Sequence, residues 1–189
     1  MTHEDSMGNK TVIRAGDVQR MSAGTGLTHS EFNLAQTPVN FYQIWIFPDQ
    51  RGLEPSYDQK SFSKGSWRNT LLPIASGQGI EETVTFYTAA TIYRCDLKKN
   101  KNVVHMATEG RRILLYVTKG EVNANGTTVS EKYQARIDID EPLKLSARES
   151  AEFILINVPS CKGSGYSADT LKGKSKKTHE PHRVFRRPG

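Results

Sequence analysis

A histidine and a glutamate two residues apart are the residues of this sequence best placed to do chemistry. His29 and Glu31 follow a Gly-x-Gly turn at residues 24–26. If residues 27–32 form a strand, both side chains project from the same face, because side chains alternate along a strand. An imidazole beside a carboxylate forms half of a site suited to iron, manganese, nickel or zinc. The alternative is a polar pair that neighbouring groups or solvent satisfy.

The elements that must position this pair are predicted to be strands throughout, which makes the fold class all-β. Short segments rich in β-branched and aromatic residues recur with turn signals about 8–12 residues apart, a spacing typical of a sandwich or barrel. No segment has the long 3.6-residue period of a helix. Strands are expected at 11–13, 18–22, 27–32, 40–47, 70–75, 83–87, 90–96, 103–106, 112–118, 122–124, 135–139, 143–146 and 151–158.

Two of these predictions are the most specific. Residues 40–47 form the most apolar segment, which predicts a central strand that ends at Pro48. Its aromatic residues are expected to serve core and interdomain packing rather than to clamp a ligand: Phe41, Tyr42, Trp45 and Phe47. Asn125-Gly126 predicts a two-residue hairpin turn, because a type I′ turn needs two positive φ angles.

Composition divides the chain into four parts. Residues 1–54 form a first β unit, 55–69 an ordered connector, 70–160 a second β unit and 161–189 a disordered basic tail. Residues 162–189 hold eight Lys and Arg against two acidic residues, which accounts for the whole net charge of +6. The remaining sequence is balanced in charge, so a basic surface for nucleic acid is not predicted, and the basic runs of the tail are interpreted as solvated.

The sequence predicts a cytoplasmic protein without a membrane segment. The chain starts with polar and acidic residues, and no apolar run is long enough to cross a bilayer. Cys95 and Cys161 lie far apart and match no metal-binding spacing, so both are interpreted as reduced thiols. His105 is predicted to be a structural histidine at a strand edge of the second unit.

Several motifs resemble the pirin family of bicupins over residues 3–159. They are His3-x-Asp5-Ser6-x-Gly8-Asn9, Gly16-Asp17-Val18-Gln19-x-Met21-Ser22-Ala23-Gly24-x-Gly26-x-x-His29-Ser30-Glu31, Gln43-Ile44-Trp45-Ile46, Gly52-Leu53-Glu54-Pro55-Ser56-Tyr57-Asp58-Gln59-Lys60, Gly110-Arg111-Arg112 and Gly120-Glu121-Val122-x-x-Asn125-Gly126. The resemblance implies two β-barrel-like cupin domains, each a double-stranded β-helix. It also implies a metal in the first domain and an activity similar to quercetin 2,3-dioxygenase, which opens a flavonol ring with O₂. A nuclear member of the family acts as a transcriptional cofactor instead.

Residue by residue, the resemblance assigns two metal ligands. His29 and Glu31 match the third and fourth ligands of the family, and Glu31 is also the candidate catalytic base. The first two ligands belong to a His-Pro-His-Arg-Gly-Phe-Glu segment upstream of His3, so an incomplete first cupin, a full second cupin and a truncated start are expected. His3 matches a position that is not a ligand.

The expected cofactor is a weakly held divalent metal, with iron ahead of nickel, manganese, zinc or copper. A flavonol-like small molecule is the expected ligand, and exposed strand edges would allow self-association. The alternative is a non-catalytic pirin-like binding or regulatory protein, or a truncated inactive paralogue. The tail sequence His179-x-x-His182 faintly resembles the absent segment, although its spacing would turn the two rings to opposite faces of a strand.

Overall fold

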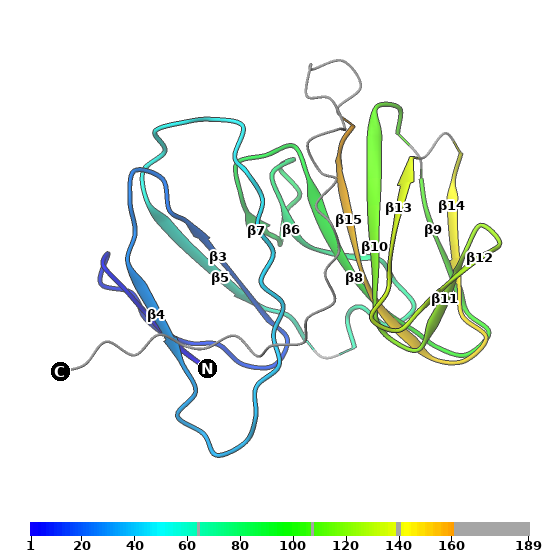
Figure 1. The fold of residues 1–189 in the computed structure, drawn as a ribbon, viewed down its shortest axis with the longest axis horizontal. Coiled ribbons are helices and arrows are strands. Elements are labelled where there is room, and N and C mark those ends of the chain that lie inside the picture. The colour runs from blue at the N-terminus through cyan, green and yellow to red at the C-terminus, as the bar shows by residue number, and fades with distance from the viewer. Residues whose placement is uncertain (64, 107, 139–140, 161–189) are drawn as a thin grey trace, which may run out of the picture.

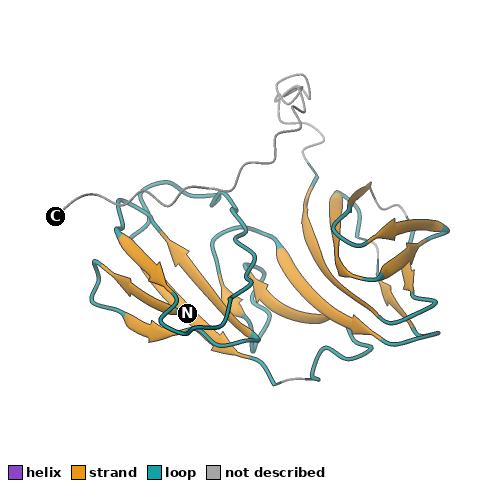
Figure 2. Cartoon of the chain, turned by 60° about the horizontal axis from the view of Figure 1, so that its bottom comes forward, coloured by secondary structure: helices purple, strands orange, loops and turns teal. Residues whose placement is uncertain are grey.

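The computed structural model describes residues 1–160 except 64, 107 and 139–140, and every regular element in that part of the chain is a strand (Figures 1 and 2). The predicted all-β class is therefore confirmed. The strands are β1 (Thr2–Asp5), β2 (Lys10–Val12), β3 (Asp17–Ser22), β4 (His29–Phe32), β5 (Ser56–Ser61), β6 (Leu72–Ser76), β7 (Val84–Thr85), β8 (Thr91–Leu97), β9 (Asn102–His105), β10 (Arg111–Lys119), β11 (Glu121–Ala124), β12 (Thr127–Ser130), β13 (Gln134–Asp138), β14 (Leu143–Ser146) and β15 (Ala151–Pro159). The predicted tail, with its two histidines and basic runs, lies outside the described residues.

The second half of the chain forms a barrel from two facing sheets, which Figure 1 shows on the right. Their strand orders are β13-β10-β15-β8-β6-β7 and β12-β11-β14-β9. Alternate residues of β10 and β15 point inward, as their alternating burial shows. Leucine, isoleucine, valine and phenylalanine side chains of both sheets meet there in one buried cluster. This arrangement agrees with the predicted cupin barrel.

The Asn125-Gly126 hairpin is confirmed. β11 pairs with β12 through Ala124 and Thr127, which leaves two residues in the turn. Their φ angles are 44° and 93°, both positive as a type I′ turn requires.

The first half of the chain forms two small sheets, β2-β1-β4 and β3-β5. Strand β5 lies within the predicted connector and pairs with β3 along six residues. These sheets bury little apolar surface, and among the described residues of 1–62 the one fully buried residue is His3. Polar contacts, rather than a hydrophobic core, therefore order this region.

The first half is attached to the outer face of the six-stranded sheet. Val18, Ile46 and Phe62 pack there against a second apolar cluster that contains Ile74 and Ile92. Polar contacts reinforce the junction, since Arg20 donates to the Thr85 carbonyl at 2.7 Å and the Thr85 amide donates to Asp58 at 3.1 Å.

Trp67 fills the junction close to the turn that follows β5. Its side chain is 7% exposed, and the guanidinium carbon of Arg94 lies 4.2 Å from its ring centroid. A β-carbon added at Gly16 would lie 3.4 Å from the edge of the same ring. Trp67 thus contacts both halves of the molecule.

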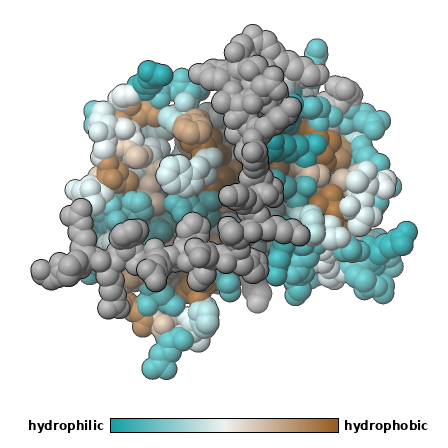
Figure 3. All heavy atoms as spheres, in the orientation of Figure 1, coloured by the Kyte–Doolittle hydropathy of each residue, from teal (hydrophilic) through white to brown (hydrophobic). Residues whose placement is uncertain are grey.

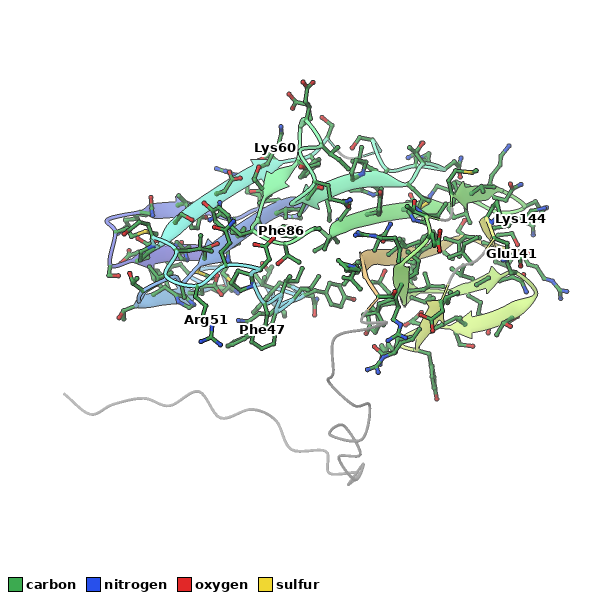
Figure 4. All side chains as sticks on the ribbon, turned by 90° about the horizontal axis from the view of Figure 1, so that it is seen from above. Phe47, Arg51, Lys60, Phe86, Glu141 and Lys144 are labelled. Atoms are coloured by element: carbon green, nitrogen blue, oxygen red, sulfur yellow. The ribbon has the colours of Figure 1, made fainter. Side chains whose placement is uncertain are left out.

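The prediction of a central strand at 40–47 is wrong. The segment forms no strand, and Phe41, Trp45 and Phe47 are 56%, 80% and 87% exposed. Figure 4 shows the side chain of Phe47 pointing away from the sheets. Hydrophobic side chains are also visible on the surface in Figure 3. The backbone of the segment pairs with none of the described strands, and strand formation depends on such a partner as well as on apolar residues. The ring of Tyr42 instead meets that of Tyr116 on β10, with centroids 5.7 Å apart. Of the segment's side chains, Ile46 joins the junction cluster.

Replacing a leucine inside the barrel should cost far more stability than the same change on the surface. Leu155 is fully buried, so Leu155→Ala removes its contacts and leaves a cavity, with an expected loss of about 2–5 kcal/mol. Leu34 is 80% exposed, and Leu34→Ala should change stability by less than about 0.5 kcal/mol. Urea unfolding followed by circular dichroism measures both, and similar losses would contradict the assigned core.

Candidate metal centre

His29 and Glu31 lie on β4, an edge strand, and their side chains share one face as predicted. The turn before β4 depends on Gly24, whose φ is 54° and whose added β-carbon would lie 2.0 Å from the Leu53 carbonyl oxygen. The Thr25 amide donates to that same oxygen at 2.9 Å. The glycine thus permits a close backbone contact that fixes where β4 begins.

Strand β1 brings a second histidine and a second acid to this face. His3 pairs with Glu31, and Asp5 pairs with His29, in the antiparallel register of β1 and β4. The rings of His3 and His29 are nearly parallel, with centroids 5.8 Å apart. His3 Nδ1 lies 3.9 Å from Glu31 Oε1, too far for a hydrogen bond. Four groups able to bind metals or protons therefore gather on one small sheet.

His3 is the centre of the cluster and is fully buried. Its Nε2 lies 3.1 Å from Asp5 Oδ2, and the ring stacks on Tyr57 with centroids 4.7 Å apart. Its Nδ1 is a buried side-chain polar atom for which the described residues offer no hydrogen-bond partner. An unpaired buried nitrogen is costly in a protein interior, so it marks a place where a further polar group would be stabilising.

Asp5 is held as a carboxylate. Burial acts to raise its pKa, but hydrogen bonds from the side chains of Asn9 and His3 and from the amides of Asn9 and Met7 outweigh burial and lower the pKa from 3.8 to about 2. An ionised Asp5 accepts the Nε2 hydrogen of His3, which assigns the lone pair of a neutral His3 to Nδ1. Asp5 thus selects the tautomer of the buried histidine.

A chain of hydrogen bonds reaches Glu31 from β3 and β5. Gln19 Nε2 donates to Glu31 Oε1. Tyr57 Oη lies 2.6 Å from Gln59 Oε1, 3.2 Å from Gln19 Oε1 and 2.7 Å from Thr11 Oγ1. Burial raises the pKa of Tyr57, with the charges of nearby acids adding to the rise and the Thr11 contact opposing it, so the phenol stays protonated. Gln19 thereby orients one oxygen of Glu31, and no described residue donates a hydrogen bond to Oε2.

The donors fit part of a metal site and do not complete it. A histidine and a carboxylate on one strand face are suitable ligands for a divalent transition metal. Among the described residues, no three His, Cys, Asp or Glu groups are arranged to hold an ion together. The pair supplies two coordination positions, and others must come from water, a bound ligand or groups outside this set.

Sequence reasoning found the His29 and Glu31 pair but did not find its surroundings. His3, Asp5, Gln19 and Tyr57 were not predicted to be site residues, although the His-x-Asp spacing at 3–5 is the same alternation as the His-x-Glu spacing at 29–31. Strand β1 was not predicted, so nothing indicated that His3 and Asp5 lie beside β4.

Comparisons with known proteins match both halves of the chain. The family model described as Pirin matches residues 1–46, and the one described as quercetinase C-terminal cupin domain matches residues 73–158. Quercetin 2,3-dioxygenase of Escherichia coli K12 is 34% identical over 158 residues, and a pirin-like protein of Caulobacter vibrioides is 33% identical over 158. Each alignment covers 83% of this chain, and 67% and 68% of the respective relative.

Solved structures give the same result. The crystal structure of YhhW from Escherichia coli matches with a TM-score of 0.78 and 33% identity, over 84% of this chain and 67% of that one. The bacterial pirin YhhW in complex with nickel(II) matches with a TM-score of 0.77 and 32% identity, over 84% and 68%. This chain spans about two thirds of the length of these relatives. Within the described residues no helix is long and apolar enough to cross a membrane.

Replacing Asp5 should make the first half of the molecule less stable and change how it responds to acid. A carboxyl whose pKa is lower in the folded state stabilises the fold above its ordinary pKa of 3.8, and this contribution is lost as the pH falls towards about 2. Asp5→Asn should therefore unfold more easily at pH 5–7, and its difference from the wild type should shrink between pH 4 and pH 2. Chemical unfolding at several pH values tests this, and a difference independent of pH would contradict it.

Proposed function

The chain belongs to the pirin family of cupin proteins, and on this basis we propose that His29 and Glu31 are two ligands of a divalent transition metal in a site of the quercetin 2,3-dioxygenase type. The observation that carries the proposal is their position on one face of β4 beside the buried His3. Iron is the first candidate metal, and nickel is supported by the nickel(II) complex of the relative YhhW. The proposed substrate class is a flavonol-like small molecule.

The residues around the pair have separate roles in this proposal. A metal bound here would act as a Lewis acid towards the hydroxyl oxygen of the substrate. Gln19 holds Glu31 Oε1, so Oε2, to which no described residue donates, would bind a cation or accept the proton of a substrate hydroxyl. His3 packs beside His29, and its Nε2 faces the Asp5 carboxylate. With two protein ligands the metal would bind weakly, since stable sites generally have three or four with supporting hydrogen bonds.

A second candidate function is a non-catalytic pirin-like binding or regulatory protein. The observation that favours it is that the described residues do not arrange three potential ligands around one point. The unpaired side of edge strand β4 and the exposed apolar side chains of 41–47 would then serve self-association. The two candidates differ in whether bound metal supports reaction with O₂.

Metal titration tests the assigned ligands. Fe²⁺ under anaerobic conditions, or Ni²⁺, should bind at one site per chain, and His29→Ala combined with Glu31→Ala should weaken that binding at least tenfold, which is about 1.4 kcal/mol. Glu4→Ala is the matched control, because Glu4 lies on β1, pairs with Lys10 at 2.7 Å and points to the opposite face from His3. Deleting residues 170–189 should leave the metal content unchanged, which separates this site from His179 and His182. Wild-type affinity in the double variant would refute the assignment.

Oxygen uptake distinguishes the two functions. The metal-loaded chain should consume O₂ slowly when quercetin is added, and Glu31→Gln should abolish the uptake because it removes both a ligand and a base. An oxygen electrode measures the rate, with metal in buffer as the blank. Metal binding without any O₂ uptake would reject the oxygenase and favour the binding protein.

A further inference from the structure

The barrel in the second half of the chain contains a polar pocket that none of the proposed chemistry uses. It has a volume of about 490 Å³ and lies where β9 ends and β10 begins. Its polar lining includes Gln78, His105, Arg111 and Asn157, and its apolar lining includes Ile80 and Tyr93. Pockets of this size, with an apolar wall and a few convergent polar groups, commonly bind small molecules.

Arg111 brings a positive charge into this pocket without an acidic partner among the described residues. Its Nε donates to Asn157 Oδ1 at 2.7 Å, and its Nη2 donates to the Asn157 carbonyl at 3.1 Å and to Gln78 Oε1 at 3.2 Å. No acceptor for Nη1 is found in the described part of the chain. Burial lowers the pKa of Arg111, a sign that its charge is partly desolvated. A desolvated guanidinium with free donors is stabilised when an anion binds to it.

The position of Asn157 shows that His105 does not supply a second charge. Because Asn157 Oδ1 accepts from Arg111, its Nδ2 must donate to His105 Nε2, which lies 3.1 Å away. His105 is therefore neutral, with its hydrogen on Nδ1. Burial and then the charge of Arg111 both lower the pKa of His105, in agreement with this assignment. The described lining thus carries a single positive charge held in a fixed orientation.

The apolar lining of the pocket indicates the chemical nature of the uncharged part of the anion. The rings of Tyr93 and His105 meet edge to face with centroids 5.3 Å apart, and Ile80 lines the same space. Burial raises the pKa of Tyr93, which keeps its hydroxyl neutral. Aromatic rings favour further aromatic contacts in such arrangements. A fully charged, strongly hydrated ion such as phosphate would leave this wall unused.

We propose that this pocket binds a small aromatic carboxylate, with the carboxylate at the Nη1 side of Arg111 and the ring against Tyr93 and Ile80. The site lies in a different sheet from His29 and Glu31, so the proposal is independent of the metal chemistry. Asn157 and Gln78 act here as positioning residues, since they hold the guanidinium in place.

Binding of benzoate to the full chain tests the proposal. At pH 7 benzoate should bind saturably, with the largest NMR shifts at Arg111, His105 and their neighbours. Benzamide has nearly the same shape without the charge, and it should bind at least tenfold more weakly. Equal affinities for the two compounds, shifts located outside the pocket, or no saturation by benzoate at tens of millimolar would each overturn the proposal. Inorganic phosphate should compete weakly, and phosphate binding as tight as that of benzoate would exclude the aromatic part.

Two neighbouring arginines provide a matched pair of variants. Arg111→Met should weaken benzoate binding at least tenfold and should leave benzamide binding unchanged. Arg112→Met is the control, because Arg112 lies on the other face of β10 and pairs with Asp138 at 2.7 Å. An equal loss in both variants would contradict the assignment. The comparison of benzoate with benzamide in the wild type decides the question even if Arg111→Met fails to fold.

Discussion

The structure depends on one strand, β15, whose two faces both carry apolar side chains that join a cluster. Inward side chains of β15 such as Phe153 and Leu155 join the barrel core, and the outward Ile154 and Ile156 join the cluster at the junction. Because successive side chains of a strand point to opposite faces, one apolar run holds the barrel together and also provides the surface on which the first half of the chain rests. A slip of one residue in the pairing of β15 with β10 would exchange these two sets of side chains.

The first half of the molecule is held together by hydrogen bonds rather than by apolar packing. Its described residues enclose no apolar core, and their central side chain is the imidazole of His3. Hydrogen bonds contribute about 1 kcal/mol each, so a network of them orients a site well but stabilises it modestly. The candidate metal ligands therefore occupy the less strongly held half of the molecule, and the junction contacts of Val18, Ile46 and Phe62 connect them to the stable barrel.

The sequence predicts the barrel well because its signals there are local. Alternating apolar residues define β10 and β15, and Asn125-Gly126 defines the hairpin between β11 and β12. The same rules failed at 40–47, where strand formation depends on a partner strand and not on the apolar residues alone. Strands β1 and β5 were missed because they are polar, and their pairing partners, β4 for β1 and β3 for β5, are distant in the sequence.

The sequence predicts the candidate sites only in part, as it does the fold. The alternation of His29 and Glu31 is visible in the sequence, and the structure places both side chains on one face. The roles of His3 and Arg111 could not be predicted, since each follows from tertiary contacts. His3 is defined by an unpaired nitrogen, and Arg111 by the lack of a nearby acid in the described part of the chain.

The two tryptophans of the chain lie in opposite environments, one buried and one exposed, so their fluorescence can report on changes in the structure. Trp67 is enclosed at the junction between the halves, under the guanidinium of Arg94, whereas Trp45 is 80% exposed. Emission from Trp67 is expected at shorter wavelength and sheltered from quenchers in solution, and emission from Trp45 at longer wavelength and open to them. Separation of the two halves would expose Trp67 while the barrel core stayed intact. Fluorescence can therefore follow the opening of the junction separately from the unfolding of the barrel, without any added label.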